Sequence, residues 1–483
     1  MRLGSPFVRI RLAVMSIIPA LSANEETPPQ IIGEFKPVDE WQVHLNALFY
    51  GLRGGRVRDY YQTLASADYR LAHALAVDFR DHWAKQKSLP PTLMVHEWGC
   101  GNGNLAACFL SHVKTLDARG ELYPKIRYVL VDDNRDALRA ALAHPDLQPH
   151  RERVAVLQAD AQDLAGVKDG SVQWILCNEL WSELRTKVVL RKEGEIIEEQ
   201  LRPNLSDAKS KEFADWSTFV KAFGTRDVAT LETYPSFLDE IIWEKDYRPV
   251  EWKHVPYRKT ITDFMKPIDD LVIVPANFGA FATLKEARRL LAPHGGFTSL
   301  DAGTPEMSVL TNPDKPCYGL HGGQYSFIVN FALCKTVARQ VGVKEVTIEP
   351  QREFVSRMLG LNLITLVDLL ETYPSPRGLT PWEQDRLTLK TLRALDGCYR
   401  SPYRRILDFP IRPETPESDR AELQALLKGL PPTGVPDTIA YLSEEEVLGA
   451  VTDLEALGFE RARVQEILAA GIPRDIDYHR FSF

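Results

Sequence analysis

The sequence predicts an α/β fold in which helices cover both faces of a mostly parallel sheet, with a largely helical insertion and a helical C-terminal region. Three observations lead to this prediction. Short apolar runs alternate with stretches of helical spacing up to about residue 190. The alternation is then lost and resumes at about residue 270, and beyond residue 350 helical spacing dominates.

The composition is that of a folded globular chain. It has 483 residues, of which 44% are hydrophobic and 26% charged, and at ~100–200 residues per domain this length predicts two to four domains. The 58 lysines and arginines are outnumbered by 66 acidic residues, for a net charge of −8. Because nucleic-acid binding needs a basic face, we expect no nucleic-acid partner.

The cysteines and the apolar runs indicate the cellular compartment of the protein. Its six cysteines form no C-x-x-C pair, which argues against a disulfide scaffold or a zinc ribbon, and we expect no metal site. A reducing compartment, the cytoplasm, is the expectation. No apolar run approaches the ~20 residues that cross a bilayer. We expect residues 1–34 to be a disordered leader, and its basic and apolar start leaves a secretory or organellar fate open.

The predicted sheet begins at Leu93–Trp98, an extended apolar run. A glycine-rich turn follows at residues 99–104, and helical spacing then returns. Further strands are predicted at Tyr128–Asp132, Val154–Asp160 and Val172–Asn178. Since apolar strands that alternate with helices form parallel sheets, these strands are expected to lie side by side.

Three regions are predicted on this basis. Residues 35–350 form the main domain, within which the aromatic-rich segment 190–270 is an insertion or lid. Residues 351–483 form a helical region, interrupted by a proline-rich linker at about 409–437. Late in that region Ser443 and Glu446 have the spacing of a capping box at the start of a helix.

The glycine turn has the pattern Glu97-x-Gly99-x-Gly101-x-Gly103. Glycine lacks a Cβ and tolerates positive φ, so a ligand can approach the backbone closely. The dinucleotide pattern G-x-G-x-x-G fits poorly, because Asn104 stands where its third glycine belongs. The turn resembles instead the first motif of the Rossmann-like class I methyltransferases, which implies S-adenosylmethionine (SAM) as the cofactor.

Acidic residues end the neighbouring strands. Asp132 is placed to accept hydrogen bonds from both ribose hydroxyls, and Asp160 with the next backbone amide to contact the adenine edge. Because ligands bind beyond the carboxyl ends of parallel strands, these acids and Glu97 are expected to converge on one crevice. The alternative for each Asp is a helix cap or a turn. A helix cap or a turn explains Glu97 less well, since burying an unpaired carboxylate is costly.

The fourth strand continues into Asn178-Glu179, and a hairpin turn follows at residues 193–199. This order resembles the MidA family of methyltransferases, relatives of the mitochondrial complex I assembly methyltransferase. The resemblance covers roughly residues 35–361. It implies a SAM-dependent methyltransferase whose acceptor is a protein side chain, an arginine or another nitrogen, or a small molecule.

The catalytic candidates follow from that resemblance. Methyl transfer is an in-line displacement that depends on alignment of the nucleophile with the methyl group. A carboxylate beside the methyl would hold and polarise an acceptor nitrogen, and Glu179 is the candidate, with Asn178 orienting the acceptor or the cofactor. The alternative is that the Asn-Glu pair only forms a strand-end turn.

The sequence departs from the family pattern at two places. Ser182 and Arg185 stand in the stretch after the Asn-Glu pair, and Ile328 and Asn330 replace a histidine and an acid later in the chain. A second hypothesis is therefore a non-catalytic assembly or binding protein that keeps the methyltransferase fold. The sequence specifies neither the acceptor nor the oligomeric state.

Overall fold

The computed structural model describes residues 28–53, 68–321, 323–374, 378–399, 401–403, 411, 415–428 and 441–483. Most of the predicted leader and of the predicted proline-rich linker lies outside these ranges. Two parts of them are described and are regular. Gln30–Ile31 (β1) is a strand, and Glu417–Lys428 (α15) is a helix inside the segment predicted as a linker.

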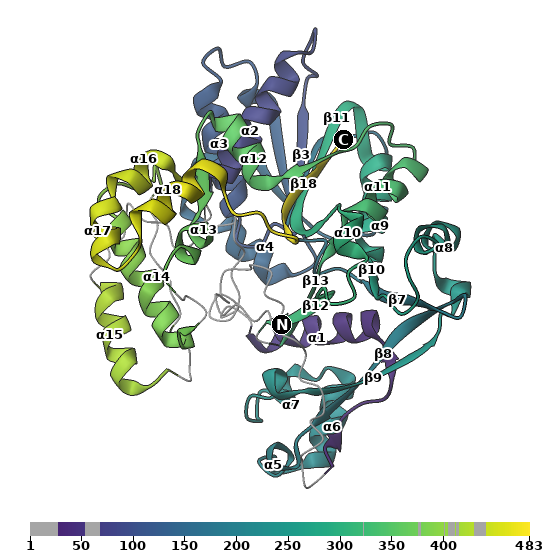
Figure 1. The fold of residues 1–483 in the computed structure, drawn as a ribbon. Coiled ribbons are helices and arrows are strands. Elements are labelled where there is room, and N and C mark those ends of the chain that lie inside the picture. Colours follow the sequence, from purple (N-terminus) through teal and green to yellow (C-terminus); the bar gives the residue numbers. More distant parts are fainter. Residues whose placement is uncertain are drawn as a thin grey trace.

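A central sheet forms the middle of the molecule (Figure 1). Its strand order is β5-β4-β3-β6-β11-β18-β15, and β14 (Val329–Asn330) adds to β11. β3 to β6 and β11 run parallel to one another, as their apolar sequences predict. The strands are β3 (Leu93–Trp98), β4 (Ile126–Asp132), β5 (Val154–Gln158), β6 (Val172–Asn178), β11 (Leu291–Thr304), β15 (Thr347–Pro350) and β18 (Asp477–Ser482).

Helices cover both faces of this sheet, so the main domain has three layers. One face packs against α2 (Tyr69–Ala84), α3 (Asn104–Leu116) and α12 (Gln351–Leu359). The other packs against α8 (Arg258–Met265), α9 (Phe278–Leu290) and α11 (Phe331–Gln340). The predicted α/β class with a parallel-dominated sheet is thereby confirmed.

Strand β18 was not expected, because residues 351–483 were predicted as a helical region. The last strand returns from that region and inserts between β11 and β15, antiparallel to both. In Figure 1 it is the yellow strand labelled β18. Its sequence, DYHRFS, is too polar to be recognised as a central strand, and its polar side chains are buried by pairing instead.

The segment 190–270 also differs from the largely helical insertion that was predicted. It contributes to a second, antiparallel sheet in which β8 (Glu195–Leu205) pairs with β7 (Lys187–Lys192) and β9 (Ile242–Pro249). β1, β2 (Lys36–Pro37) and β10 (Val274–Ala276) complete that sheet. Around it lie the helices α1 (Val38–Arg53), α5 (Asp207–Ser210), α6 (Trp216–Thr225) and α7 (Val228–Leu231).

The aromatic residues of this insertion form a core rather than an exposed surface. Phe213, Phe219, Phe223 and Phe237 are buried in one cluster with Trp41 of α1. Aromatic rings supply large apolar area, so they hold the small sheet and its helices together.

The helical region between β15 and β18 has its own hydrophobic core. Its helices start at good caps: the predicted Ser443–Glu446 capping box is present, and Thr365–Asp368 and Thr380–Glu383 form two more. Its elements are β16 (Leu363–Thr365), α13 (Leu366–Glu371), α14 (Pro381–Leu395), β17 (Tyr441–Ser443), α16 (Glu444–Gly449), α17 (Val451–Ala456) and α18 (Arg461–Ala470).

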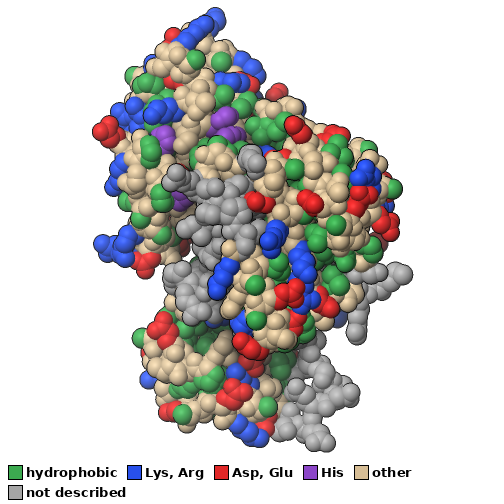
Figure 2. All heavy atoms as spheres, turned by 90° about the vertical axis from the view of Figure 1, so that its left-hand side faces the viewer, with side chains coloured by type: hydrophobic (Ala, Val, Ile, Leu, Met, Phe, Trp, Pro, Cys, Tyr) green, Lys and Arg blue, Asp and Glu red, His purple; other side chains and the backbone are tan. Residues whose placement is uncertain are grey.

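The side of the molecule that carries the helical region shows basic and acidic side chains interspersed (Figure 2). Ion pairs such as Arg386–Glu422 and Lys390–Glu422 account for part of this mixing. Within the described ranges, none of the helices is both long enough and apolar enough to cross a membrane. All six cysteines are free thiols, and five of them are buried.

We predict that Arg480→Met lowers the free energy of unfolding by about 3 kcal/mol, because it leaves the mostly buried Asp78 carboxylate without its ion-pair partner and removes one of the two arginines, Arg480 and Arg357, that pair with Glu349. Arg480 on β18 lies 2.5 Å from Asp78 and 2.9 Å from Glu349, with its guanidinium 4.3 Å from the Phe354 ring centre. Urea unfolding measures the change. The control is Arg463→Met, at an exposed pair with Glu466, for which we expect little effect. An equal loss in both variants would contradict this account of β18.

Candidate functional site

The glycine turn lies between β3 and α3, at the carboxyl end of the parallel strands. All three glycines have positive φ: 70° for Gly99, 50° for Gly101 and 78° for Gly103. The Gly99 amide donates to the carbonyl of Val131 at 2.8 Å, which fixes the turn against the end of β4. The turn therefore has the positive φ angles that its glycines predict.

The glycines differ in what a side chain would meet. A Cβ on Gly103 would come within 3.0 Å of Ala141, and one on Gly99 within 3.0 Å of the Leu180 side chain. A Cβ on Gly101 would meet nothing within 4 Å. Gly99 and Gly103 thus permit close packing, whereas Gly101 faces open space where a ligand could lie against the backbone.

Asp132 ends β4 directly beside this open space. Its carboxylate accepts hydrogen bonds from the Gly101 amide and from the Asn134 amide, the latter at 2.9 Å. Burial raises the pKa of Asp132 to about 6, and the neighbouring Asp133 and Glu183 add to the effect. The side chain therefore points toward the glycine turn, as the sequence hypothesis requires, and holds a carboxylate poised to titrate just below neutral pH.

Asp160 lies at the same edge, after β5. The Ala159 amide donates to the carbonyl of Asp132 at 3.1 Å, so the turn at Asp160 is held next to the end of β4. The exposed carboxylate of Asp160 accepts from the Gln162 amide at 2.8 Å, as a turn-forming Asp does. Burial and the charge of Asp160 raise the pKa of Asp133, which indicates that the two carboxylates are close.

Glu97 is placed differently from the other acids. It is 2% exposed, on the face of β3 that α2 and α3 cover, and its Oε2 accepts a hydrogen bond from the Tyr128 hydroxyl at 2.7 Å. Burial raises the pKa of Glu97 to about 8. It therefore keeps its proton at neutral pH, which avoids most of the cost of a buried charge. Its place is under the glycine turn, in the interior.

The Asn178-Glu179 pair lies at the end of β6, next to β3 in the sheet. Glu179 has a φ of 51°, and its amide donates to the carbonyl of Leu300 at 2.7 Å. A positive φ in a residue other than glycine is strained, and such strain clusters at functional sites. Leu180 contacts Gly99, so this turn packs on the glycine turn. The Oδ1 atom of Asn178 is buried and has no hydrogen-bond partner among the residues that the structure describes.

Two residues that the sequence did not indicate complete this edge. Tyr478 of β18 donates its hydroxyl to Oε2 of Glu179 at 3.2 Å. Asp301 of β11 is fully buried and accepts from the Ser182 amide at 3.0 Å, which fixes the chain after Glu179. Tyr478 lies 299 positions after its partner, and no local pattern points to it.

The residues that depart from the family pattern have structural partners of their own. Arg185 forms an ion pair with Asp39 at 2.7 Å, and Asn330 caps α11 by accepting from the Leu333 amide. Arg185 thus links the segment before β7 to α1, and Asn330 fixes the start of α11.

A protein-family model matches part of the chain. The model of a family described as "Putative S-adenosyl-L-methionine-dependent methyltransferase" matches residues 74–252. The matched segment contains the glycine turn, Asp132, Asp160 and the Asn178-Glu179 pair, which the structure brings to one edge of the sheet. The α/β domain is a SAM-dependent methyltransferase domain. No curated protein sequence matches the chain.

Among solved structures, two from Burkholderia thailandensis resemble the chain. One is bound to S-adenosyl-homocysteine, with 13% identity, a TM-score of 0.44, and coverage of 89% of this chain and 92% of the other. The second has 14% identity, a TM-score of 0.43 and the same coverage. A SAM-dependent methyltransferase from Aquifex aeolicus has 11% identity and a TM-score of 0.26, over 58% of this chain and 84% of the other. These similarities are too weak to assign residues.

We predict that cofactor affinity weakens below pH 6, because the hydrogen bonds expected from the ribose hydroxyls to Asp132 are strongest to its ionised carboxylate. With a pKa of about 6, the affinity should fall by roughly tenfold per pH unit below that value. Calorimetric titration with S-adenosyl-homocysteine between pH 5 and 8 measures this. Asp132→Asn should bind more weakly at pH 7.5 and lose most of the pH dependence. An affinity that is flat in the wild type would contradict the role of Asp132.

Proposed function

We propose that the chain is a MidA-type methyltransferase that transfers the methyl group of SAM to a nitrogen of a protein side chain. The observation that carries the proposal is the packing of the Asn178-Glu179 turn on the glycine turn through Leu180. The proposal takes the Glu179 carboxylate and the buried Asn178 Oδ1, which has no hydrogen-bond partner among the described residues, to border the cofactor over Gly101. A buried acceptor without a donor is costly, so a bound ligand is its natural partner.

The residues fit the cofactor by their chemistry. SAM carries a ribose with two hydroxyl donors, which suit the Asp132 carboxylate, and it has no phosphate that would need the dinucleotide pattern. The backbone at Gly101 leaves room for the methionine part. Asp160 and the following amide are proposed to contact the adenine. Bound at this edge, the cofactor would supply an electrophilic methyl group.

The protein's own groups would then position the acceptor. Glu179 holds an acceptor nitrogen through a charge-assisted hydrogen bond and takes up its proton as the N–C bond forms. Asn178 accepts a hydrogen bond from the acceptor or the cofactor. The proposed acceptor is an arginine or another basic side chain, because a carboxylate is the group that binds such nitrogens best. The free thiols fit a reducing compartment, the cytoplasm.

We predict that Gly101→Arg abolishes measurable binding of S-adenosyl-homocysteine in calorimetry, because the side chain would fill the open space over the turn. The matched control is Gly120→Arg: Gly120 has a φ of 66°, also has open space around it, and lies in the exposed loop after α3. Both variants carry the same backbone strain, but only the first should lose binding. Binding by Gly101→Arg at wild-type affinity would place the cofactor elsewhere.

We predict that Glu179→Gln slows methyl transfer by about 100-fold or more, the range of general-base catalysis, while binding of S-adenosyl-homocysteine changes little. Transfer is measured with tritiated SAM and a cognate cell lysate. The control is Glu193→Gln, since Glu193 also has positive φ, at 52°, but lies in the exposed β7–β8 turn. Cofactor binding without any transfer by the wild type would favour the non-catalytic assembly or binding protein instead.

A further inference from the structure

A further acid, Glu183, follows the Asn178-Glu179 turn at the end of β6. The Glu183 amide donates to the Leu180 carbonyl at 3.1 Å, and the Leu180 side chain is the group that lies against Gly99. Leu180 and Glu183 therefore belong to one tight turn, and that turn packs on the glycine turn.

The Glu183 carboxylate is held by a chain of two hydrogen bonds. Its Oε2 atom lies 2.6 Å from the Tyr50 hydroxyl of α1, and the Tyr50 oxygen lies 2.9 Å from Nε2 of Gln324 on β13 (Gln324–Phe327). Because an ionised carboxylate only accepts hydrogen bonds, Tyr50 donates to Glu183 and accepts from Gln324. Gln324 is fully buried, so the chain starts from a fixed point in the interior.

The elements that carry these side chains are fixed to one another. Asn46 of α1 donates to the Tyr325 carbonyl at 3.1 Å and accepts from the Tyr325 amide at 2.8 Å. The Phe327 amide donates to the carbonyl of Ser182, the residue before Glu183, at 2.9 Å. α1, β13 and the turn after β6 thus form one junction, which sets the position of the Glu183 carboxylate.

Glu183 lies close to the two acids that end β4. Burial raises the pKa of Asp133, and the charges of Asp160 and Glu183 raise it further. Burial also raises the pKa of Asp132, to about 6, with contributions from the charges of Asp133 and Glu183. One carboxylate raises the pKa of another because the two negative charges repel at short range. Since Asp132 accepts from the Gly101 amide, Glu183 is near the glycine turn as well.

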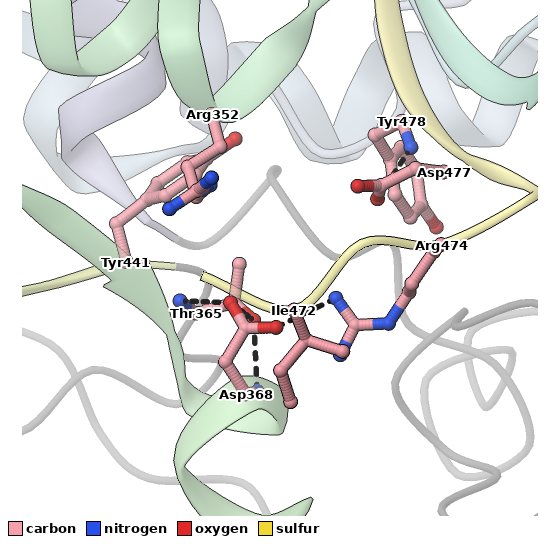
Figure 3. A pocket seen from close by; sticks show the side chains of 8 residues that line it. All are labelled: Arg352, Thr365, Asp368, Tyr441, Ile472, Arg474, Asp477 and Tyr478. Carbon is pink, nitrogen blue, oxygen red and sulfur yellow. Dashed lines mark hydrogen bonds and ion pairs between the residues drawn. The ribbon is translucent and has the colours of Figure 1, made fainter. Parts of the chain in front are cut away.

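The acids on the β18 side of this edge have a different environment. Figure 3 shows a small cavity where the segment between α18 and β18 meets the sheet, with Arg474 directed toward Asp368. Arg474 lies 2.6 Å from Asp368. Burial raises the pKa of Asp477, and the charge of Arg474 lowers it. Among the described residues, the strongest charge effects on Asp132 and Asp133 come instead from other acids. Repulsion between acids is therefore the pattern beside the glycine turn, and pairing with arginine is the pattern on the β18 side.

The charge of the ligand changes in the reaction. SAM carries a sulfonium cation, whereas in S-adenosyl-homocysteine the sulfur has kept the electron pair of the broken C–S bond and is neutral. A positive charge close to several acids relieves their mutual repulsion, and a neutral ligand of the same shape does not. An acid that is held in place before the ligand binds therefore favours the cofactor over its product.

We propose that Glu183, held by Tyr50 and Gln324, selects the charged cofactor over the neutral product. Its charge acts on the sulfonium through space, and it takes no part in proton transfer, which is the proposed role of Glu179. The consequence is that S-adenosyl-homocysteine leaves and is replaced by SAM instead of blocking the site. This selection rests on the proposed function, in which the cofactor lies at the glycine turn.

The first test compares three ligands by calorimetric titration: SAM, S-adenosyl-homocysteine, and sinefungin, which has a protonated amine where SAM has its methylated sulfur. Glu183→Gln should weaken SAM and sinefungin by about 10-fold, the order expected for the loss of one nearby charge, and leave S-adenosyl-homocysteine nearly unchanged. Tyr50→Phe should weaken the same two ligands by less, because Glu183 keeps its charge and loses only its fixed position. The control is Glu193→Gln, which removes a charge in the exposed β7–β8 turn and should alter none of the three affinities.

The second test uses the wild type alone, so it does not depend on whether a variant folds. The same titrations are repeated as the salt concentration is raised from about 0.05 M to about 0.5 M. Salt screens the attraction between the acids and a cation, so the affinities for SAM and sinefungin should fall severalfold more than the affinity for S-adenosyl-homocysteine.

The possible results separate this selection from the proposed function. Equal weakening of all three ligands in Glu183→Gln, or equal salt dependence of the three in the wild type, would overturn the role of Glu183 and leave the methyltransferase function standing. The same loss of preference in Glu193→Gln as in Glu183→Gln would assign the preference to net charge and also overturn that role. A wild type that binds none of the three ligands would overturn both proposals.

Discussion

The central sheet depends on the pairing of β18 with the strands on both of its sides. This strand comes from the end of the chain and inserts, antiparallel, between β11 and β15. Its hydrogen bonds and the Arg480 ion pairs to Asp78 and Glu349 connect it to α2 and to β15. Among the described strands, β15 joins the sheet through β18. Because β18 runs against its neighbours, it also brings Tyr478 to the edge where the parallel strands end.

The candidate site is built from two turns whose residues have positive φ angles. The glycine turn uses residues without side chains to leave open space over Gly101, and the Asn178-Glu179 turn, whose Leu180 lies against Gly99, has a strained φ at Glu179. The acids around them differ in protonation: Glu97 is buried and neutral at neutral pH, whereas Asp132 titrates near pH 6. Asp132 can therefore accept hydrogen bonds from hydroxyl groups, while the neutral Glu97 supports the glycine turn from the interior.

The sequence predicted the parts of the fold that repeat a local pattern. β3, β4, β5 and β6 are continuous apolar runs, and the glycine turn follows the first of them, so the methyltransferase sheet and its cofactor edge could be anticipated. The parts that it missed depend on long-range pairing. β18 is polar, and the ion pairs of Arg480 with Asp78 and Glu349 let it lie within the sheet. β8 is rich in charged residues, and β9 has both aromatic and charged residues, so neither reads as an apolar strand. Tyr478 reaches Glu179 only through this topology.

A crystal structure of the protein with S-adenosyl-homocysteine tests the central claim most directly. The account predicts that the ligand lies across Gly99–Gly103, with its ribose hydroxyls on Asp132 and its sulfur directed toward Glu179. A ligand bound away from the glycine turn, or side chains that fill the space over Gly101, would contradict it.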